Sequence, residues 1–274
     1  MIGDSAKLII MTRSDQPDEI ARLVLEVNDL TVSYGNFKAV DKVSFSTKAG
    51  EIFGLIGPNG AGKTTTLSAI ENLIKPDSGN ISLNGLDIFK HQIESKANIG
   101  VQLQSTSFQY ELNIIQLIKL YSGLYNVALT ESQINDSLEK IGLSHEAKRR
   151  FKQLSGGQQQ RLSLFIANIH HPMLLLLDEP TAGLDPQSRR QLWDTIESNR
   201  HDGGSILLTT HSMEEAQAVC DRVAIMDVGK IIVSDTPEQL IETYRTDPRV
   251  IEVARKEVTL EDVFIGLTGG QIRE

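Results

Sequence analysis

Cysteine is almost missing from this chain of 274 residues, in which Cys220 is the single copy. One thiol cannot form an intrachain disulfide, and it cannot build a zinc site of the kind that uses several cysteines. The composition therefore excludes a disulfide-stabilised scaffold and suits a reducing compartment.

Long apolar runs are also missing. The longest runs, such as MLLLL at residues 173–177, are far shorter than the roughly 20 residues that a membrane-spanning helix needs. If the protein works at a membrane, we expect another chain to cross it.

Basic residues are too few for a generic nucleic-acid binder. The chain has 27 Lys and Arg against 36 Asp and Glu, which gives a net charge of −9. Proteins that neutralise many phosphates normally carry a basic excess. We therefore expect no nucleic-acid partner. The hydrophobic share of 40% is ordinary for a chain that buries a core.

The most informative stretch is GPNGAGKT at residues 57–64, which fits the pattern G-x-x-x-x-G-K-[ST]. EIFGLIG before it has the length of a strand, and TTTLSAIENLI after it is typical of a helix. Glycines let backbone N–H groups turn toward a phosphate, and the start of the helix attracts the same anion. Lys63 can then reach the outer phosphates, and the Thr64 hydroxyl can bind Mg²⁺. The predicted loop comprises Gly57, Pro58, Asn59, Gly60, Ala61, Gly62, Lys63, Thr64 and Thr65.

Two further motifs supply what hydrolysis of a triphosphate needs. LLLLDE at residues 174–179 ends a buried strand with Asp178, which would take a Mg²⁺ position, and with Glu179, which can polarise the attacking water. LSGGQQQR at residues 154–161 places Ser155 and two glycines before a helical run. Such a helix start is a second candidate for binding an anion.

Together these motifs resemble those of the nucleotide-binding subunit of an ATP-binding-cassette (ABC) transporter, over roughly residues 24–240. GPNGAGKT resembles its Walker A, LSGGQ its signature and LLLLDE its Walker B. AGLD at residues 182–185 resembles the D-loop, and His211 after SILLTT resembles the switch histidine. The resemblance implies an α/β fold, namely a P-loop NTPase core of the ABC type with an antiparallel β subdomain and an inserted helical subdomain.

Two positions of the family pattern have two candidates each. IGVQLQST offers Gln102 and Gln104 for the glutamine loop, and family spacing favours Gln104. Tyr34, which lies 23 residues before Gly57, matches the aromatic residue that stacks on adenine, with Phe37 as a weaker candidate.

In this family two nucleotide-binding domains close head to tail on two ATP molecules, so the resemblance implies a site split between subunits. The catalytic residues would be Lys63, Gln104, Glu179 and His211, and the Mg²⁺ ligands Thr64, Gln104 and Asp178. Tyr34 would hold the adenine, and Asp185 would couple the two sites. From the other subunit, the γ-phosphate would be capped by Ser155, Gly156, Gly157 and Gln158.

The expected domain division has three parts. Residues 1–22 form a tail, residues 23–240 form the ATP-binding domain with its helical subdomain at about 105–170, and residues 241–274 form a short extension. LVLEVNDLTVSY, AVDKVSFST and EIFGLIG are expected to share an antiparallel sheet, and GNISLNGLDI is expected to form a hairpin. Helices are expected over residues 111–125 and 131–143.

The resemblance also implies partners. We expect a second nucleotide-binding subunit, as a homodimer, and integral membrane permease subunits. The chain itself would be cytoplasmic and peripheral, on the cytoplasmic face of the cell membrane. Docking would use the insertion near residues 104–125, where Phe108, Tyr110 and Leu112 are either docking side chains or ordinary subdomain core. The ending VTLEDVFIGLTG resembles those of the export branch.

Two alternatives remain from the sequence. One is a soluble ABC ATPase of DNA repair or translation, although such proteins usually carry two cassettes or a long coiled-coil insertion. The other is a nucleotide-sensing module without catalysis, against which the presence of both Glu179 and His211 argues.

Overall fold

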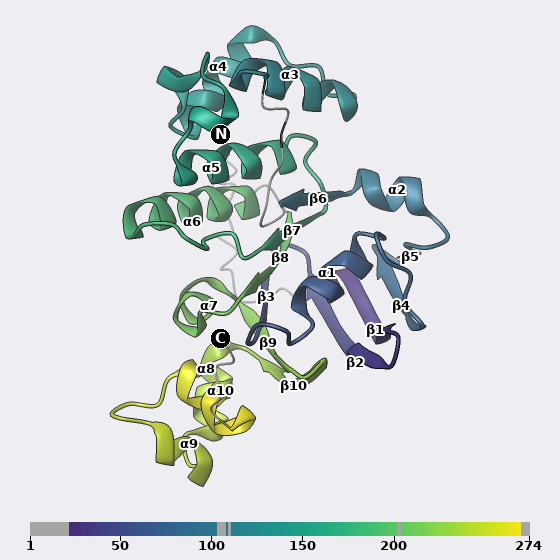
Figure 1. Cartoon of the computed structure of the whole chain (residues 1–274), viewed down its shortest axis with the longest axis vertical. Coiled ribbons are helices and arrows are strands. Elements are labelled where there is room, and N and C mark those ends of the chain that lie inside the picture. The colour runs from purple at the N-terminus through teal and green to yellow at the C-terminus, as the bar shows by residue number, and fades with distance from the viewer. Residues whose placement is uncertain (1–21, 103–107, 109–110, 202–203, 270–274) are drawn as a thin grey trace, which may run out of the picture.

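The computed structural model describes residues 22–102, 108, 111–201 and 204–269. Figure 1 shows two sheets with helices around them. The first sheet is antiparallel in the order β2-β1-β4-β5, which confirms the predicted strands and the predicted hairpin. Its strands are β1 (Leu23–Tyr34), β2 (Phe37–Lys48), β4 (Ser78–Leu83) and β5 (Leu86–Asp87).

The second sheet has six strands in the order β10-β9-β3-β8-β7-β6, and only β10 runs antiparallel to its neighbour. The parallel strands end along one edge, which is where ligands bind in open α/β sheets. The strands are β3 (Ile52–Ile56), β6 (Ile99–Gln102), β7 (Leu174–Asp178), β8 (Ser205–Thr210), β9 (Arg222–Asp227) and β10 (Lys230–Asp235).

The expectation that EIFGLIG belongs to the antiparallel sheet is wrong. Its strand, β3, pairs in parallel with β8 and β9. Both faces of β3 are buried: Phe53 packs toward the antiparallel sheet, whereas Ile52 and Ile56 pack toward the helices on the other face. An unbroken apolar run, rather than an alternating one, is typical of such a strand.

The helices lie beside the second sheet and at both ends of the molecule (Figure 1). Several begin with capping boxes, in which the N-cap side chain and the side chain three residues later satisfy each other's backbone N–H groups. The helices are α1 (Lys63–Ile70), α2 (Gln92–Ala97), α3 (Ile114–Leu124), α4 (Glu131–Lys140), α5 (Gly156–Ala167), α6 (Pro186–His201), α7 (Met213–Val219), α8 (Pro237–Tyr244), α9 (Pro248–Val253) and α10 (Leu260–Thr268). None of the helices in the described ranges has the length and apolar content of a membrane span.

A separate hydrophobic cluster holds α3, α4 and α5 together. Phe108 lies in it at 5% exposure, with its ring edge-on to Tyr121 and Phe151 at centroid distances of 5.3 and 4.8 Å. Leu112 packs against the same cluster. Phe108 is therefore a core residue of this group of helices rather than an exposed docking side chain. Tyr110 lies outside the described residues.

The contact between β6 and the end of α5 leaves no room for a side chain at Gly100. A Cβ there would lie 2.2 Å from the Ala167 carbonyl oxygen. We expect Gly100→Ala to lower the free energy of unfolding by about 1–3 kcal/mol, the usual cost of overpacking. Urea denaturation measures this change.

Gly123→Ala is the matched control, because a Cβ at that position in α3 meets nothing within 4 Å. Replacing a helical glycine by alanine is expected to stabilise by up to about 1 kcal/mol. Equal denaturation midpoints for the two variants would contradict the close packing of β6 on α5.

Candidate active site

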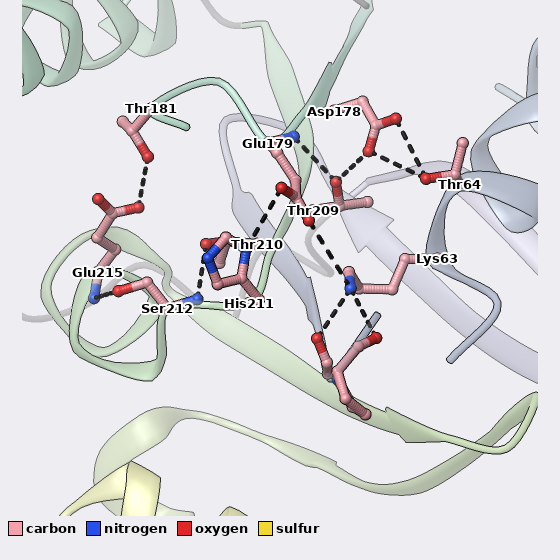
Figure 2. A network of polar contacts seen from close by, with 12 residues as sticks. Lys63, Thr64, Asp178, Glu179, Thr181, Thr209, Thr210, His211, Ser212 and Glu215 are labelled. Atoms are coloured by element: carbon pink, nitrogen blue, oxygen red, sulfur yellow. Dashed lines mark hydrogen bonds and ion pairs between the residues drawn. The ribbon is translucent and has the colours of Figure 1, made fainter. Parts of the chain in front are cut away.

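Three of the predicted catalytic residues, Lys63, Glu179 and His211, converge because the strands that precede them are neighbours in one sheet. β3, β8 and β7 are adjacent, and they lead into the glycine loop, His211 and Glu179 respectively. Figure 2 shows the side chains from these three strand ends turned toward one another. The parallel register therefore brings the glycine loop to two segments that lie more than 100 residues later in the chain.

The loop after β3 approaches neighbouring backbone too closely for any residue but glycine at two positions. Gly62 has φ of 102°, and a Cβ there would lie 2.4 Å from the Ala39 carbonyl oxygen. A Cβ at Gly57 would lie 2.2 Å from the Met226 carbonyl oxygen. The two glycines thus let the loop curl against β2 and β9 before α1 begins.

Lys63, the first residue of α1, is buried inside this loop. Its Nζ donates to the Gly57 and Pro58 carbonyl oxygens at 2.8 and 3.0 Å, and lies 4.0 Å from Glu179 Oε1. Burial lowers the pKa of Lys63, and the charges of Glu179 and Asp178 oppose that shift. The ammonium is therefore held between the loop and the carboxylate that would act on the water.

Asp178 and Thr64 form the expected pair of Mg²⁺ ligands. The Thr64 hydroxyl donates to the Asp178 carboxylate, at 3.2 Å from Oδ2 and 3.4 Å from Oδ1. Thr209 donates a second hydrogen bond to the same carboxylate from its own hydroxyl. Hydroxyl and carboxylate oxygens are the hard ligands that Mg²⁺ prefers, and a lysine with a curled loop at a helix start suits phosphates. The residues present thus fit a magnesium-bound triphosphate.

Glu179 is held in an unusual backbone conformation. Its φ is +46°, in the left-handed region that non-glycine residues rarely adopt, and strained backbone of this kind clusters at functional sites. Its N–H points at both the carbonyl and the hydroxyl oxygen of Thr209, each at 3.1 Å. Its Oε2 lies 3.3 Å from His211 Nδ1. Glu179 is therefore held at its backbone by Thr209, and its carboxylate contacts His211.

Thr209 is a residue of this site that the sequence reasoning missed. It touches both Asp178 and Glu179, because β7 and β8 pair with Asp178 opposite Thr209. The available signal was a pair of polar threonines at the end of the apolar strand SILLTT, directly before His211.

Several predicted residues lie apart from this group. Ser155 and Gln158 cap α5 in a reciprocal capping box, and Asp185 caps the first turn of α6 by accepting from the N–H groups of Gln187 and Ser188, both at 3.0 Å. Hydrogen bonds to Ser188 lower the pKa of Asp185. Within the described residues, no hydrogen bond or ion pair joins these groups to the glycine loop or to Glu179.

The two ambiguous positions stay open. Tyr34 and Phe37 face each other across the β1–β2 turn and are 56% and 62% exposed, so either ring is available to a base. Gln104 lies outside the described residues. Gln102 is buried at the end of β6 and donates to Gln160 on α5.

Comparison with known proteins identifies the class to which this arrangement belongs. A family model described as ABC transporter matches residues 40–182. The linearmycin resistance ATP-binding protein LnrL of Bacillus subtilis is 37% identical over 219 residues, 79% of this chain and 70% of LnrL. The Nod factor export ATP-binding protein I of Ralstonia nicotianae is 36% identical over 232 residues, 84% of this chain and 72% of that protein.

A longer relative and two solved structures agree with this class. The probable multidrug ABC transporter ATP-binding protein YbhF of Escherichia coli K12 is 37% identical over 246 residues, 89% of this chain but 41% of YbhF, so this chain spans less than half of that relative. An ATP-binding subunit of an ABC transporter superposes with a TM-score of 0.78 at 26% identity, covering 89% of this chain and 99% of the other. An ATP-binding cassette of an ABC transporter in its ADP conformation gives 0.71 at 25% identity, covering 84% and 97%.

The fold and the site therefore define an ATP-binding cassette. The chain belongs to the ABC transporter family and carries the ATP-binding domain of that family.

Glu71, directly after α1, is a buried carboxyl group close to this site. It is 8% exposed, and no hydrogen bond or ion pair to its side chain occurs among the described residues. Burial raises the pKa of Glu71 from the ordinary glutamate value of 4.5 to about 7, and the negative charge of Asp178 adds to the shift. The folded protein therefore binds this proton more tightly than the unfolded chain, so Glu71 costs stability as the pH rises from 4.5 through about 7.

We expect Glu71→Gln, measured without nucleotide, to raise the free energy of unfolding at pH 8.5 by about 1–3 kcal/mol, because a neutral side chain has no ionisation to suppress. The gain should shrink toward zero at pH 5. Thermal unfolding across this range checks it. Glu139→Gln, at an exposed position of α4, should give no comparable trend. If Glu71→Gln raised the free energy of unfolding equally at both pH values, this would contradict a raised pKa of the buried Glu71 carboxyl group.

Proposed function

We propose that this chain hydrolyses ATP and thereby powers transport, in the export direction, through separate transmembrane subunits. The observation that carries the proposal is the meeting of Glu179 with Lys63 and His211 beside the Asp178–Thr64 pair (Figure 2). A carboxylate placed between a lysine and a histidine, at the mouth of a phosphate loop, has the position required of a group that accepts a proton from an attacking water.

Each residue has a distinct role in this proposal. Mg²⁺, held by Thr64 and Asp178 with Gln104, would neutralise charge on the phosphates. Lys63 leaves the Gly57 and Pro58 carbonyl oxygens and binds the outer phosphates. Glu179 orients the water and accepts its proton, while His211 fixes the Glu179 carboxylate and contacts the γ-phosphate. Tyr34 stacks on the adenine.

The site is half of a larger one. The N-terminus of α5 is capped by Ser155, and the first N–H groups of a helix, which have no partner within the helix, favour an anion. We propose that Ser155, Gly156, Gly157 and Gln158 of a second, identical subunit close over the γ-phosphate, with Asp185 coupling the two sites. The support is that these residues make no hydrogen bond or ion pair with the loop of their own chain within the described part.

The transport role rests on the relatives. LnrL and the Nod factor protein are named for resistance and for export, and YbhF for multidrug transport. These names favour an exporter over a soluble ATPase of DNA repair or translation. We propose that the chain binds permease subunits on the cytoplasmic face of the membrane, through the surface near residues 104–125.

We also propose that the chain divides into a tail (1–22), an ATP-binding domain (23–240, with its helical subdomain at 105–170) and an extension (241–274).

Glu179→Gln tests this proposal, because an amide cannot accept the proton from water yet keeps the size and shape of the carboxylate. We expect turnover to fall at least about 100-fold, the usual scale for losing a general base, while ATP binding persists. The variant should then accumulate as an ATP-bound dimer on a sizing column with ATP and Mg²⁺.

Glu214→Gln, an exposed acid on α7, is the control and should hydrolyse ATP as the unchanged chain does. A Glu179→Gln protein that stays monomeric with ATP and Mg²⁺ would argue against the closed dimer. Retained turnover would argue against Glu179 as the base.

A further inference from the structure

Glu215 is a buried carboxylate to which the proposed mechanism gives no role. It lies in the first turn of α7 and is 8% exposed. Its Oε2 accepts a hydrogen bond from the Thr181 hydroxyl at 2.6 Å, and its Oε1 lies 2.9 Å from Arg189 Nε. The second contact is an ion pair rather than a hydrogen bond, because Arg189 Nε has no aligned acceptor among the described residues. Moving Arg189 away would leave the buried charge of Glu215 without its ion-pair partner, and moving Thr181 away would remove its hydrogen bond.

Glu215 and the two partners of its carboxylate belong to segments that each carry a predicted site residue a few positions earlier in the sequence. Thr181 lies in the turn after β7, Arg189 lies in α6, and Glu215 lies in α7. Thr181 follows Glu179 by two positions in the sequence. Arg189 follows Asp185 by four positions, and Glu215 follows His211 by four. One carboxylate therefore links the chain around the expected base, the D-loop helix and the helix after the switch histidine.

A second set of contacts extends from the backbone of Glu215 to the two residues that flank His211. The Glu215 N–H donates to the Ser212 hydroxyl at 3.3 Å, and the Ser212 N–H donates to the Thr210 hydroxyl at 3.0 Å. Figure 2 shows these contacts on both sides of His211 and, further along, the hydrogen bond to Thr181. The residues that flank the histidine are thus fixed relative to α7.

The Glu179–His211 contact needs such support. The imidazole is 57% exposed, so little packing holds it at 3.3 Å from the carboxylate. Glu179 also keeps a strained backbone at φ of +46°, and strain of this kind persists only where the surroundings impose it. The turn that contains Thr181 begins immediately after Glu179 and is tied to α7 by Glu215.

We propose that Glu215 is a positioning residue that holds the Glu179 and His211 segments in the geometry required for hydrolysis. The inference rests on the proposed ATPase function. The hydrogen-bond and ion-pair partners of Glu215 within the described ranges are Thr181, Arg189 and Ser212, and none of them belongs to the phosphate loop. Loss of Glu215 should therefore slow turnover and leave nucleotide binding nearly unchanged.

Steady-state ATP hydrolysis by the full chain tests this, with thermal unfolding measured in parallel. We expect Glu215→Ala to lower kcat by at least about tenfold while KM for ATP stays within about threefold, the pattern of lost geometry in the transition state. Glu215→Gln should retain at least about half of the activity, since its amide oxygen still accepts from Thr181. Glu214→Ala removes the same charge from the neighbouring exposed position and should have no effect.

Thr181→Val provides the second variant, because it keeps the side-chain shape and should fold even if Glu215→Ala does not. It should lower kcat by about as much as Glu215→Ala, and the double variant should be little worse than either, because both single variants remove the hydrogen bond between Thr181 and Glu215. Normal kcat in Thr181→Val or in folded Glu215→Ala would overturn the inference, as would a Glu215→Gln variant as slow as Glu215→Ala. An unchanged chain without ATPase activity would instead overturn the proposed function.

Discussion

The parallel pairing of β7 with β8 is the constraint on which the site depends. It sets Asp178 opposite Thr209, whose hydroxyl donates to the Asp178 carboxylate and receives the N–H of Glu179. A slip of one residue in this register would turn Thr209 to the other face of the sheet, because side chains alternate along a strand. The expected metal ligand and the expected base would then lose their common support.

The burial of the sheet on both faces makes this register firm. Alternate residues of β7 pack into two different hydrophobic clusters, Leu174 and Leu176 into one and Leu175 and Leu177 into the other. Rigid strands therefore supply the groups on one side of the proposed phosphate position. The capped start of α5 belongs to the group of helices α3, α4 and α5, which pack around a separate hydrophobic cluster. This arrangement is consistent with our proposal that a second subunit completes the site.

Contiguous motifs could be predicted from the sequence, because local chemistry defines them. The glycine loop, the acidic pair and the boundaries of most helices depend on neighbours in the chain. The sheet membership of β3 could not be predicted in the same way, because both edges of a buried apolar run can pair with distant strands. Thr209 and Glu215 were missed for a similar reason: their partners lie about 30 residues away in the sequence and meet them only in the folded chain. Whether Tyr34 or Phe37 stacks on the adenine depends on where a bound base lies, because both rings are exposed.

The most direct measurement of the central claim is Mn²⁺ binding, followed by electron paramagnetic resonance with ATP present. Mn²⁺ prefers the same oxygen ligands as Mg²⁺ and reports its own immobilisation. The account predicts that Asp178→Asn weakens nucleotide-dependent Mn²⁺ binding by at least about tenfold, whereas Asp194→Asn, at an exposed position of α6, leaves it unchanged. Equal Mn²⁺ affinity in the unchanged chain and in Asp178→Asn would contradict the claim that the β7–β8 pairing builds the metal site.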